Sequence, residues 1–304
     1  MTSRPAHSGS LAAALCCGGV LLDGGLGTLL EARGQDLSSS LWSARLLLEH
    51  PAAILEAHRE YFRAGADVAT SASYQVTYDG LAASGHGAGA VERLLRLSVS
   101  LAAQARAEIR PGGWVAASVG PFGASRADGS EYRGDYGLTV VELRDWHRRR
   151  LEVLIDSGAD VLAVETIPSL AEVEAIVSEI DGTGIPAWIS VTSADGLLRS
   201  GESLERAFEI AGDIDEVIAV GVNCTHPRDI AAVIAAAREA TSAPMIVYPN
   251  SGEIWDAAGR RWAGKPGLSG KLVQEWIAAG AAAVGGCCRI GPAEIASLAA
   301  WASR

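Results

Sequence analysis

The sequence predicts a single (β/α)8 TIM barrel, the α/β fold in which eight parallel strands alternate with helices. Eight short runs of apolar and β-branched residues recur along the 304-residue chain, and longer segments rich in Ala, Leu, Glu and Arg separate them. Near-continuous apolar strands between helices indicate a parallel sheet that is buried on both faces. Eight such units in a chain of this length fit one barrel. An open doubly wound sheet is the alternative that the pattern leaves open.

The expected strands cover residues 20–23, 67–71, 114–119, 161–165, 187–191, 217–223, 244–249 and 282–285. The expected helices lie near residues 52–64, 91–108, 140–157, 170–180, 203–211, 227–240, 269–279 and 292–302. Two irregular insertions, residues 120–138 and 250–267, follow the third and seventh strands, where barrel enzymes carry their substrate loops. We expect residues 1–17 to form a disordered tail and residues 18–304 to form the barrel domain.

Composition and charge narrow the class of partner. The chain is 49% hydrophobic and 20% charged, with a formal net charge of −11. Nucleic acids and anionic membranes need a positive protein surface, so we expect neither as a partner and predict small-molecule substrates. No segment reaches the roughly 18 uninterrupted apolar residues of a membrane span. The five cysteines are odd in number and sparse, which favours a reducing cytoplasm and metal-binding or catalytic thiols over a disulfide scaffold.

Three cysteines follow strand ends on one rim of the predicted barrel. Cys224 comes directly after the sixth strand, and Cys287 and Cys288 follow the eighth. Three thiolates with an open fourth position form a zinc site that accepts an external ligand. We expect Gly285 and Gly286 to give the turn the freedom to aim both thiols inward. The alternatives are inert buried thiols or a vicinal disulfide.

Carboxylates also follow two of the strands. Asp23 ends the first strand, before Gly24 and Gly25, and Glu165 ends the fourth. Exposed glycine amides can bind a carboxylate, and two carboxylates can bind an ammonium group. Together they suit the two charged ends of an amino acid.

The remaining cysteines and the histidines are weaker candidates for functional residues. Cys16 and Cys17 precede the first strand, at the opposite end of the barrel, and we assign them no function. His58 and His147 fall in helical segments and are typical of surface or interface residues, whereas His226 lies close enough in sequence to Cys224 to be a fourth or outer ligand. Arg289 has two open interpretations, an electrostatic partner of the thiolates or a loop anchor.

Seven motifs together resemble one known family. They are DGGLGT, TSASYQ, GPFGASRADGSEYRGDY, VETIPS, GVNCTHP, YPNSGEIWD and GGCCRIGP. The chain resembles the homocysteine S-methyltransferase family over residues 18–302, and most closely its S-methylmethionine-dependent branch. Two departures from the family pattern, Leu29 and Phe122, bear on the methyl donor more than on the reaction.

The resemblance implies one zinc ion per chain, held by Cys224, Cys287 and Cys288. It implies that Asp23 and Glu165 bind the amino group of L-homocysteine and that Gly24 and Gly25 bind its carboxylate. Asn223 is implied as an outer residue beside the first ligand. The implied reaction transfers a methyl group from a sulfonium donor, S-methylmethionine or S-adenosylmethionine, to the homocysteine thiol and gives methionine. No folate or cobalamin module is expected.

Aromatic residues near the rim are candidates for binding the sulfonium, because cations are attracted to aromatic faces. The candidates are Tyr74, Phe122, Tyr248 and the loop around Trp255. Ordinary packing is the alternative for each of them. Three competing functions also remain: a zinc hydrolase, a non-catalytic zinc or amino-acid binding barrel, and the same chemistry on selenocysteine or a related thiol.

Overall fold

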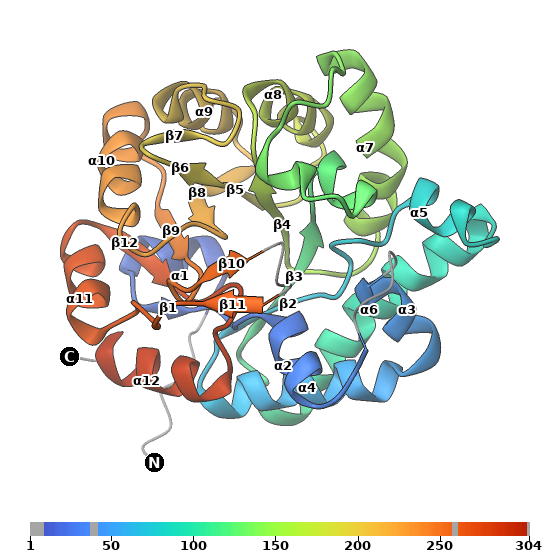
Figure 1. The fold of residues 1–304 in the computed structure, drawn as a ribbon, viewed down its shortest axis with the longest axis horizontal. Helices are drawn as coiled ribbons and strands as arrows, with labels where there is room; N and C mark the ends of the chain where they lie inside the picture. Colours follow the sequence, from blue (N-terminus) through green and yellow to red (C-terminus); the bar gives the residue numbers. More distant parts are fainter. Residues whose placement is uncertain (1–8, 37–41, 257–260, 303–304) are drawn as a thin grey trace.

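The computed structural model describes residues 9–36, 42–256 and 261–302. Eight parallel strands form one sheet in the order β1-β12-β9-β8-β5-β4-β3-β2. A parallel bridge between Leu22 and Val68 joins the two edges, so the sheet closes as the predicted barrel (Figure 1). The strands are β1 (Val20–Leu21), β2 (Val68–Thr70), β3 (Trp114–Val119), β4 (Val161–Ile167), β5 (Ala187–Val191), β8 (Val217–Asn223), β9 (Met245–Tyr248) and β12 (Ala281–Val284).

The eight predicted helices are present with small shifts in their ends, and they surround the sheet (Figure 1). They are α4 (Pro51–Ala64), α6 (Ala88–Ile109), α7 (Val140–Ile155), α8 (Leu170–Ile180), α9 (Leu204–Ala211), α10 (Ile230–Ala240), α11 (Gly270–Ala278) and α12 (Pro292–Ala302). Four further helices were not expected from the sequence: α1 (Leu11–Cys17), α2 (Leu26–Ala32), α3 (Trp42–Glu49) and α5 (Tyr78–Ala83). Among the described residues, no helix combines the length and apolar composition needed to cross a bilayer.

Helix α1 corrects the prediction of a disordered tail for residues 11–17; residues 1–8 lie outside the described part. The Ser10 hydroxyl caps the helix by accepting from the Ala13 amide at 3.3 Å. Leu11 and Leu15 are buried among the side chains that fill the barrel interior. A helix this short is not stable alone, so its burial against the end of the barrel is what stabilises it. The adjoining Cys16 and Cys17 are exposed.

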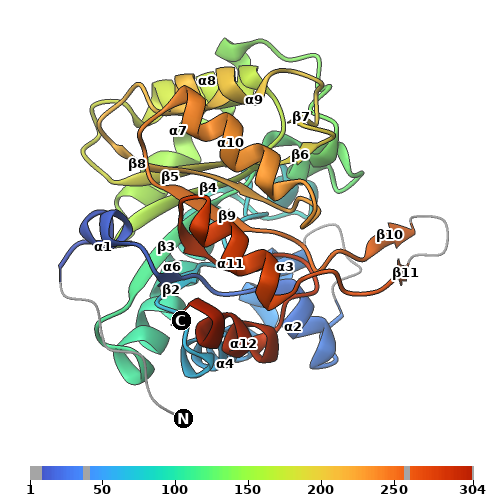
Figure 2. The same cartoon turned by 90° about the vertical axis from the view of Figure 1, so that its left-hand side faces the viewer.

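The opposite end of the barrel carries short hairpins (Figure 2). One pairs β6 (Ser193–Ala194) with β7 (Leu197–Leu198), and the other pairs β10 (Ile254–Asp256) with β11 (Arg261–Ala263). The first insertion instead forms two 3-10 turns, η1 (Phe122–Arg126) and η2 (Ser130–Tyr132). Both insertions thus add ordered structure where the strands end.

Asp67 holds the seam where β1, β2 and β3 meet. Its carboxylate accepts from the Leu21 amide at 3.0 Å and pairs with Arg110 at 2.5 Å, while its carbonyl accepts from the Trp114 amide at 2.8 Å. Because this carboxylate is buried, the ion pair and hydrogen bonds offset its desolvation.

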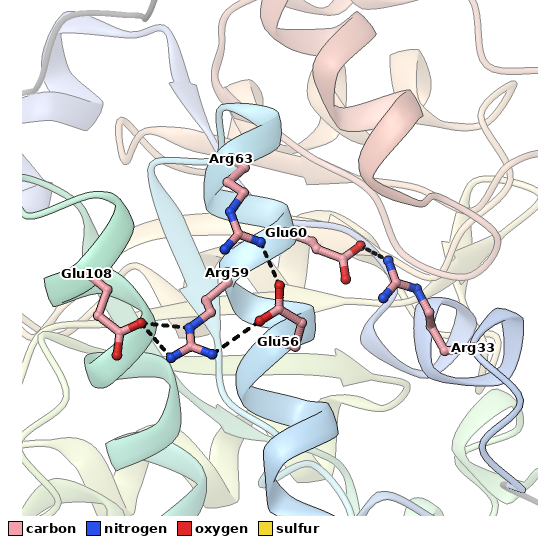
Figure 3. A network of polar contacts seen from close by, with 6 residues as sticks. All are labelled: Arg33, Glu56, Arg59, Glu60, Arg63 and Glu108. Atoms are coloured by element: carbon pink, nitrogen blue, oxygen red, sulfur yellow. Dashed lines mark hydrogen bonds and ion pairs between the residues drawn. The ribbon is translucent and has the colours of Figure 1, made fainter.

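A network of charged side chains connects α4 to α2 and α6 (Figure 3). It contains Arg33, Glu56, Arg59, Glu60, Arg63 and Glu108. Arg59 bridges Glu56 at 3.1 Å and Glu108 at 2.6 Å. These side chains are partly exposed, and such ion pairs contribute roughly 0–1 kcal/mol each. The buried apolar residues between helices and sheet therefore contribute most of the packing energy.

The prediction that His58 and His147 are surface or interface residues is wrong, since both are completely buried within the chain. Neither ring nitrogen of His58 has a hydrogen-bond partner in the part of the chain that the structure describes. Burial lowers its pKa from 6.5 to about 4, because the charged ring would lose its hydration.

We expect stability to fall as the pH is lowered from 6.5 toward 4. The unfolded chain takes up a proton at His58 in this range and the folded chain does not. Its contribution between pH 7.5 and pH 5.5 is about 1.4 kcal/mol of unfolding free energy. Urea unfolding of the wild type and His58→Gln at both pH values measures it, with the exposed His50→Gln as control. An unchanged pH dependence in His58→Gln would contradict the assignment.

Candidate active site at the C-terminal rim of the barrel

Three thiols converge where β8 and β12 end. The Sγ atoms of Cys224, Cys287 and Cys288 all lie within 4.8 Å of one another. Cys224 and Cys287 are in disulfide contact, with Cα atoms 5.6 Å apart, and the Cys288 thiol is free. Burial raises the pKa of Cys288 to about 11. A bound cation would reverse this effect, so the donor set fits a thiophilic metal once the pair is reduced.

Backbone hydrogen bonds hold the turn that carries Cys287 and Cys288. The Cys287 amide donates to the Pro249 carbonyl at 2.8 Å, and the Cys288 amide donates to Asn250 Oδ1 at 3.2 Å. The Ser251 amide in turn donates to the Cys288 carbonyl at 3.0 Å. The segment after β9 therefore positions both thiols.

Gly285 and Gly286 act through close packing, which corrects the predicted role of backbone freedom. Neither has a positive φ. A Cβ added at Gly285 would lie 2.6 Å from Leu22 Cβ, and one at Gly286 would lie 2.1 Å from Ile290 Cγ2. The turn needs glycine because its neighbours leave no space for a side chain.

The same explanation applies to Gly24 and Gly25. The Gly25 amide donates to the Ile290 carbonyl at 2.9 Å. It is therefore not free to bind a substrate carboxylate, contrary to the prediction. A Cβ at Gly25 would lie 2.5 Å from the Cys287 carbonyl oxygen, and one at Gly24 would lie 2.3 Å from that of Ile290. The two glycines bring the first strand against the cysteine turn.

Of the two interpretations of Arg289, a partner of the thiolates or a loop anchor, the structure supports the loop anchor. Its guanidinium group pairs with Glu253 at 3.1 Å, and its amide donates to Thr28 Oγ1 at 2.8 Å. Its φ of 68° lies in the left-handed region, where side chains are strained. His226 is also accounted for: Nε2 lies 3.2 Å from the Gly252 carbonyl, and Nδ1 accepts from the Arg228 amide at 3.1 Å. Both of its nitrogens are therefore engaged away from the thiols.

Asp23 lies at the end of β1, with a side chain that is 5% exposed. Its two oxygens accept from the Thr70 amide at 2.7 Å and the Thr70 hydroxyl at 3.0 Å. Burial raises its pKa to about 8 against the effect of these hydrogen bonds, and the nearby Glu165 raises it further. A ligand with a positive charge would relieve both costs.

Glu165 lies two residues before the end of β4, is partly buried, and accepts a hydrogen bond from the Ser118 hydroxyl. Tyr248 also bonds to this carboxylate, and the Tyr248 oxygen accepts from Trp188 Nε1 at 3.1 Å. Burial raises the pKa of Glu165 to about 7. Tyr248, predicted on the donor side, therefore supports the acidic residue instead.

Asn223 fixes the backbone that follows Glu165. Its Oδ1 accepts from the Thr166 amide at 2.7 Å, and its Nδ2 donates to Thr166 Oγ1 at 2.7 Å. Thr166 and Cys224 both have positive φ, 64° and 47°. Asn223 thus joins two strained residues, one beside the acid and one bearing a thiol.

The predicted aromatic residues divide into two kinds. Tyr74 packs on Gly120 and bonds to Thr166, close to the acidic residue. Phe122 packs inside the insertion, 5.2 Å from the ring of Tyr136 and 5.2 Å from that of Trp146. The side chain of Trp255 lies outside the described part.

Sequence reasoning missed Tyr132, which hydrogen-bonds to the Cys288 sulfur from η2. The signal available was the long insertion after the third strand, which predicted a substrate loop but did not select a residue within it.

The barrel and its site together define an enzyme-like α/β barrel, with a thiol cluster able to hold a metal ion and, on the same rim, one buried and one partly buried carboxylate. The model of the family described as homocysteine S-methyltransferase matches residues 20–302. The chain therefore belongs to the homocysteine S-methyltransferase family, a family of methyltransferase enzymes.

Similar proteins cover nearly the whole chain. Homocysteine S-methyltransferase 4 of Zea mays is 46% identical over 93% of this chain and 89% of its own length, and Homocysteine S-methyltransferase YbgG of Bacillus subtilis is 45% identical over 93% and 94%. The metallated form of the homocysteine methyltransferase MmuM from Escherichia coli has a TM-score of 0.84 and 40% identity, covering 92% of this chain and 95% of that one. Its oxidized form has a TM-score of 0.82, 42% identity and the same coverage.

We expect Gly286→Ala to displace the cysteine turn, because the added methyl group would overlap the buried Ile290. Overpacking of this kind costs roughly 1–3 kcal/mol. Thermal unfolding and the amount of metal that reduced protein binds measure the two effects. Gly89→Ala is the matched control, since its Cβ would meet only Arg93 Nη1 at 3.7 Å. Equal stability and metal content in both variants would contradict the packing role of Gly286.

Proposed function

We propose that this chain transfers a methyl group from a small sulfonium compound, S-methylmethionine in particular, to the thiol of L-homocysteine. The observation that carries the proposal is the convergence of three thiols on the same rim as the buried carboxylate of Asp23 and the partly buried carboxylate of Glu165. Family membership supports the reaction class. The thiols require a reducing compartment, and we place the enzyme in the cytoplasm on that ground.

Cys224, Cys287 and Cys288 would hold one zinc ion in their reduced state. Zinc supplies a Lewis acid that favours the thiolate form of a fourth sulfur, and the thiolate is the strong nucleophile. The chain holds its thiols in place through the hydrogen bonds that the backbone amides of the cysteine turn donate. It also keeps His226 away from the metal by a hydrogen bond to the Gly252 carbonyl.

Asp23 and Glu165 would bind the ammonium group of the acceptor amino acid. Burial raises their pKa values to about 8 and about 7, and the charge of Glu165 raises that of Asp23 further. An ammonium group between them offsets these effects and favours their ionised forms. Binding would therefore be specific for a cationic end group.

The chemical step balances without another reactant. The homocysteine thiol loses its proton to solvent, and its sulfur forms a bond to the methyl carbon while the bond from that carbon to the sulfonium sulfur breaks. The electron pair of the broken bond stays on the departing sulfur. S-methylmethionine and homocysteine are therefore both converted into methionine. A sulfonium is already an activated leaving group, and the protein mainly has to align the reacting atoms.

Selenocysteine is a second candidate acceptor. A relative named Selenocysteine Se-methyltransferase, from Brassica oleracea var. italica, is 42% identical over 92% of this chain and 88% of its own length. A selenolate places similar demands on a thiophilic metal. Competition between the two acceptors in one assay separates them by the ratio of their kcat/KM values.

Replacing each thiol by alanine tests the metal site. We expect Cys224→Ala, Cys287→Ala and Cys288→Ala to lose most bound zinc and at least about a hundredfold in the rate of methionine formation. Zinc content and initial rates with S-methylmethionine or S-adenosylmethionine are measured on reduced protein. Cys17→Ala, at the other end of the barrel, is the control and should match the wild type. Full zinc content and activity in any of the three variants would exclude the three-thiolate site.

Neutralising the carboxylates tests the acceptor site. We expect Asp23→Asn and Glu165→Gln to raise the KM for homocysteine by about tenfold or more, because hydrogen bonds between charged groups contribute roughly 1.5–3 kcal/mol. The KM for the methyl donor should change little. Steady-state kinetics with each substrate varied in turn measures both constants, and an unchanged KM for homocysteine removes the residue from the ammonium site.

A further inference from the structure

The insertion after β3 is a tightly packed unit. The Ser130 hydroxyl of η2 donates to the Gly123 carbonyl of η1 at 3.2 Å. A Cβ at Gly123 would lie 2.4 Å from the Glu131 amide nitrogen, so the two turns are in direct contact. Glu131 and Tyr132 are therefore held in one place at the rim, beside Cys288.

Buried polar residues fix the base of this insertion. Glu172 Oε1 accepts from the Phe122 amide at 2.5 Å and lies 2.9 Å from His147 Nε2. Arg150 donates to the Gly120 carbonyl, and its Nη2 lies 3.1 Å from His147 Nδ1. The side chains of Glu172, His147 and Arg150 are all at most 1% exposed. These hydrogen bonds anchor the chain where the first turn begins, at Gly120 and Phe122.

Several buried acceptors near η1 have no hydrogen-bond partner within the described ranges. Glu131 Oε2 and Gln75 Oε1 are two of them, and Glu172 Oε2, at the base of the insertion, is another. The Gln75 amide nitrogen donates to the Ala124 carbonyl at 3.4 Å, which places Gln75 against the same turn that contacts Glu131. An unsatisfied buried acceptor is costly, and a bound cation offsets that cost through the attraction between its positive charge and the acceptor oxygen.

Three tyrosines and one thiol lie close enough to the Glu131 carboxylate for its charge to raise their pKa values. Its charge acts on Tyr74, Tyr132, Tyr136 and Cys288. Its cationic neighbour Arg133 is half exposed and pairs with Asp135 at 3.3 Å. Aromatic faces and a carboxylate are the groups that bind a quaternary or sulfonium cation.

We propose that Glu131, together with Gln75, binds the positively charged methyl donor and selects a sulfonium over a neutral thioether. This assignment rests on the proposed function and names its donor subsite. The attraction ends with the reaction, because loss of the methyl cation converts the donor into a thioether whose sulfur is uncharged. Glu131 thus favours binding of the donor and release of its product.

The test measures charge selectivity, with homocysteine saturating so that added methionine competes only at the donor subsite. The KM for S-methylmethionine and the competitive inhibition constant of methionine are determined for wild type and Glu131→Gln. We expect the KM to rise about tenfold or more and the inhibition constant to change less than about threefold. The KM for homocysteine should stay within a factor of about two.

Two variants separate charge recognition from folding. Glu131→Asp keeps the charge and should recover part of the selectivity, whereas Asp135→Asn removes an exposed charge from the same insertion and should match the wild type. A parallel rise in the KM for S-methylmethionine and the inhibition constant of methionine, or no change in either, would overturn the assignment of Glu131. A wild type that transfers no methyl group from any sulfonium would instead overturn the proposed function.

Discussion

The close contact between the first and last βα turns is the constraint on which the site depends. Gly24 and Gly25 meet the carbonyl oxygens of Ile290 and Cys287, at positions where a single methyl group would overlap them. The Tyr61 hydroxyl donates across the same seam, 2.9 Å from the Gly25 carbonyl and 3.2 Å from that of Ile290. This contact lies where the first and last strands pair, and it brings Asp23 beside the cysteine turn, where the Gly286 amide donates to the Asp23 carbonyl at 3.1 Å. The packing of the first strand against the last one therefore also assembles the site.

Strained residues at two strand ends complete the arrangement. Thr166 and Cys224 adopt left-handed conformations that cost about 1–3 kcal/mol each when a side chain is present. Asn223 offsets part of this cost with two hydrogen bonds to Thr166, and the Thr192 hydroxyl donates to the Cys224 carbonyl at 3.3 Å. The strain turns the strand ends toward the rim, where Glu165 and the thiol face the site.

The sequence was sufficient for the barrel, because near-continuous apolar strands such as residues 114–119 allow few alternatives to a doubly covered parallel sheet. The position of Cys224, Cys287 and Cys288 on one rim followed from the predicted fold, since the carboxyl ends of parallel strands lie at the same end of a barrel. Contacts between distant segments were not predictable. Helix α1 is too short to show a period, and the pairing of Arg289 with Glu253 depends on tertiary packing alone. The burial of His58 and the hydrogen bond of the Gly25 amide also depend on contacts between distant segments, so the sequence did not predict them.

The acidic groups of the site are costly to ionise while it is empty, and the proposed ligands would offset this cost. Three thiols, Asp23, Glu165 and Glu131 are gathered in surroundings that disfavour negative charge, as the raised pKa values of Asp23, Glu165 and Cys288 show. Each proposed ligand brings the opposite charge: a metal cation for the thiols, an ammonium for the Asp23 and Glu165 pair, and a sulfonium for Glu131. Methyl transfer removes one positive charge from the donor and one negative charge from the acceptor sulfur. The site then holds two neutral thioethers, and the electrostatic attraction that bound the reacting groups is lost at the moment when the products must leave.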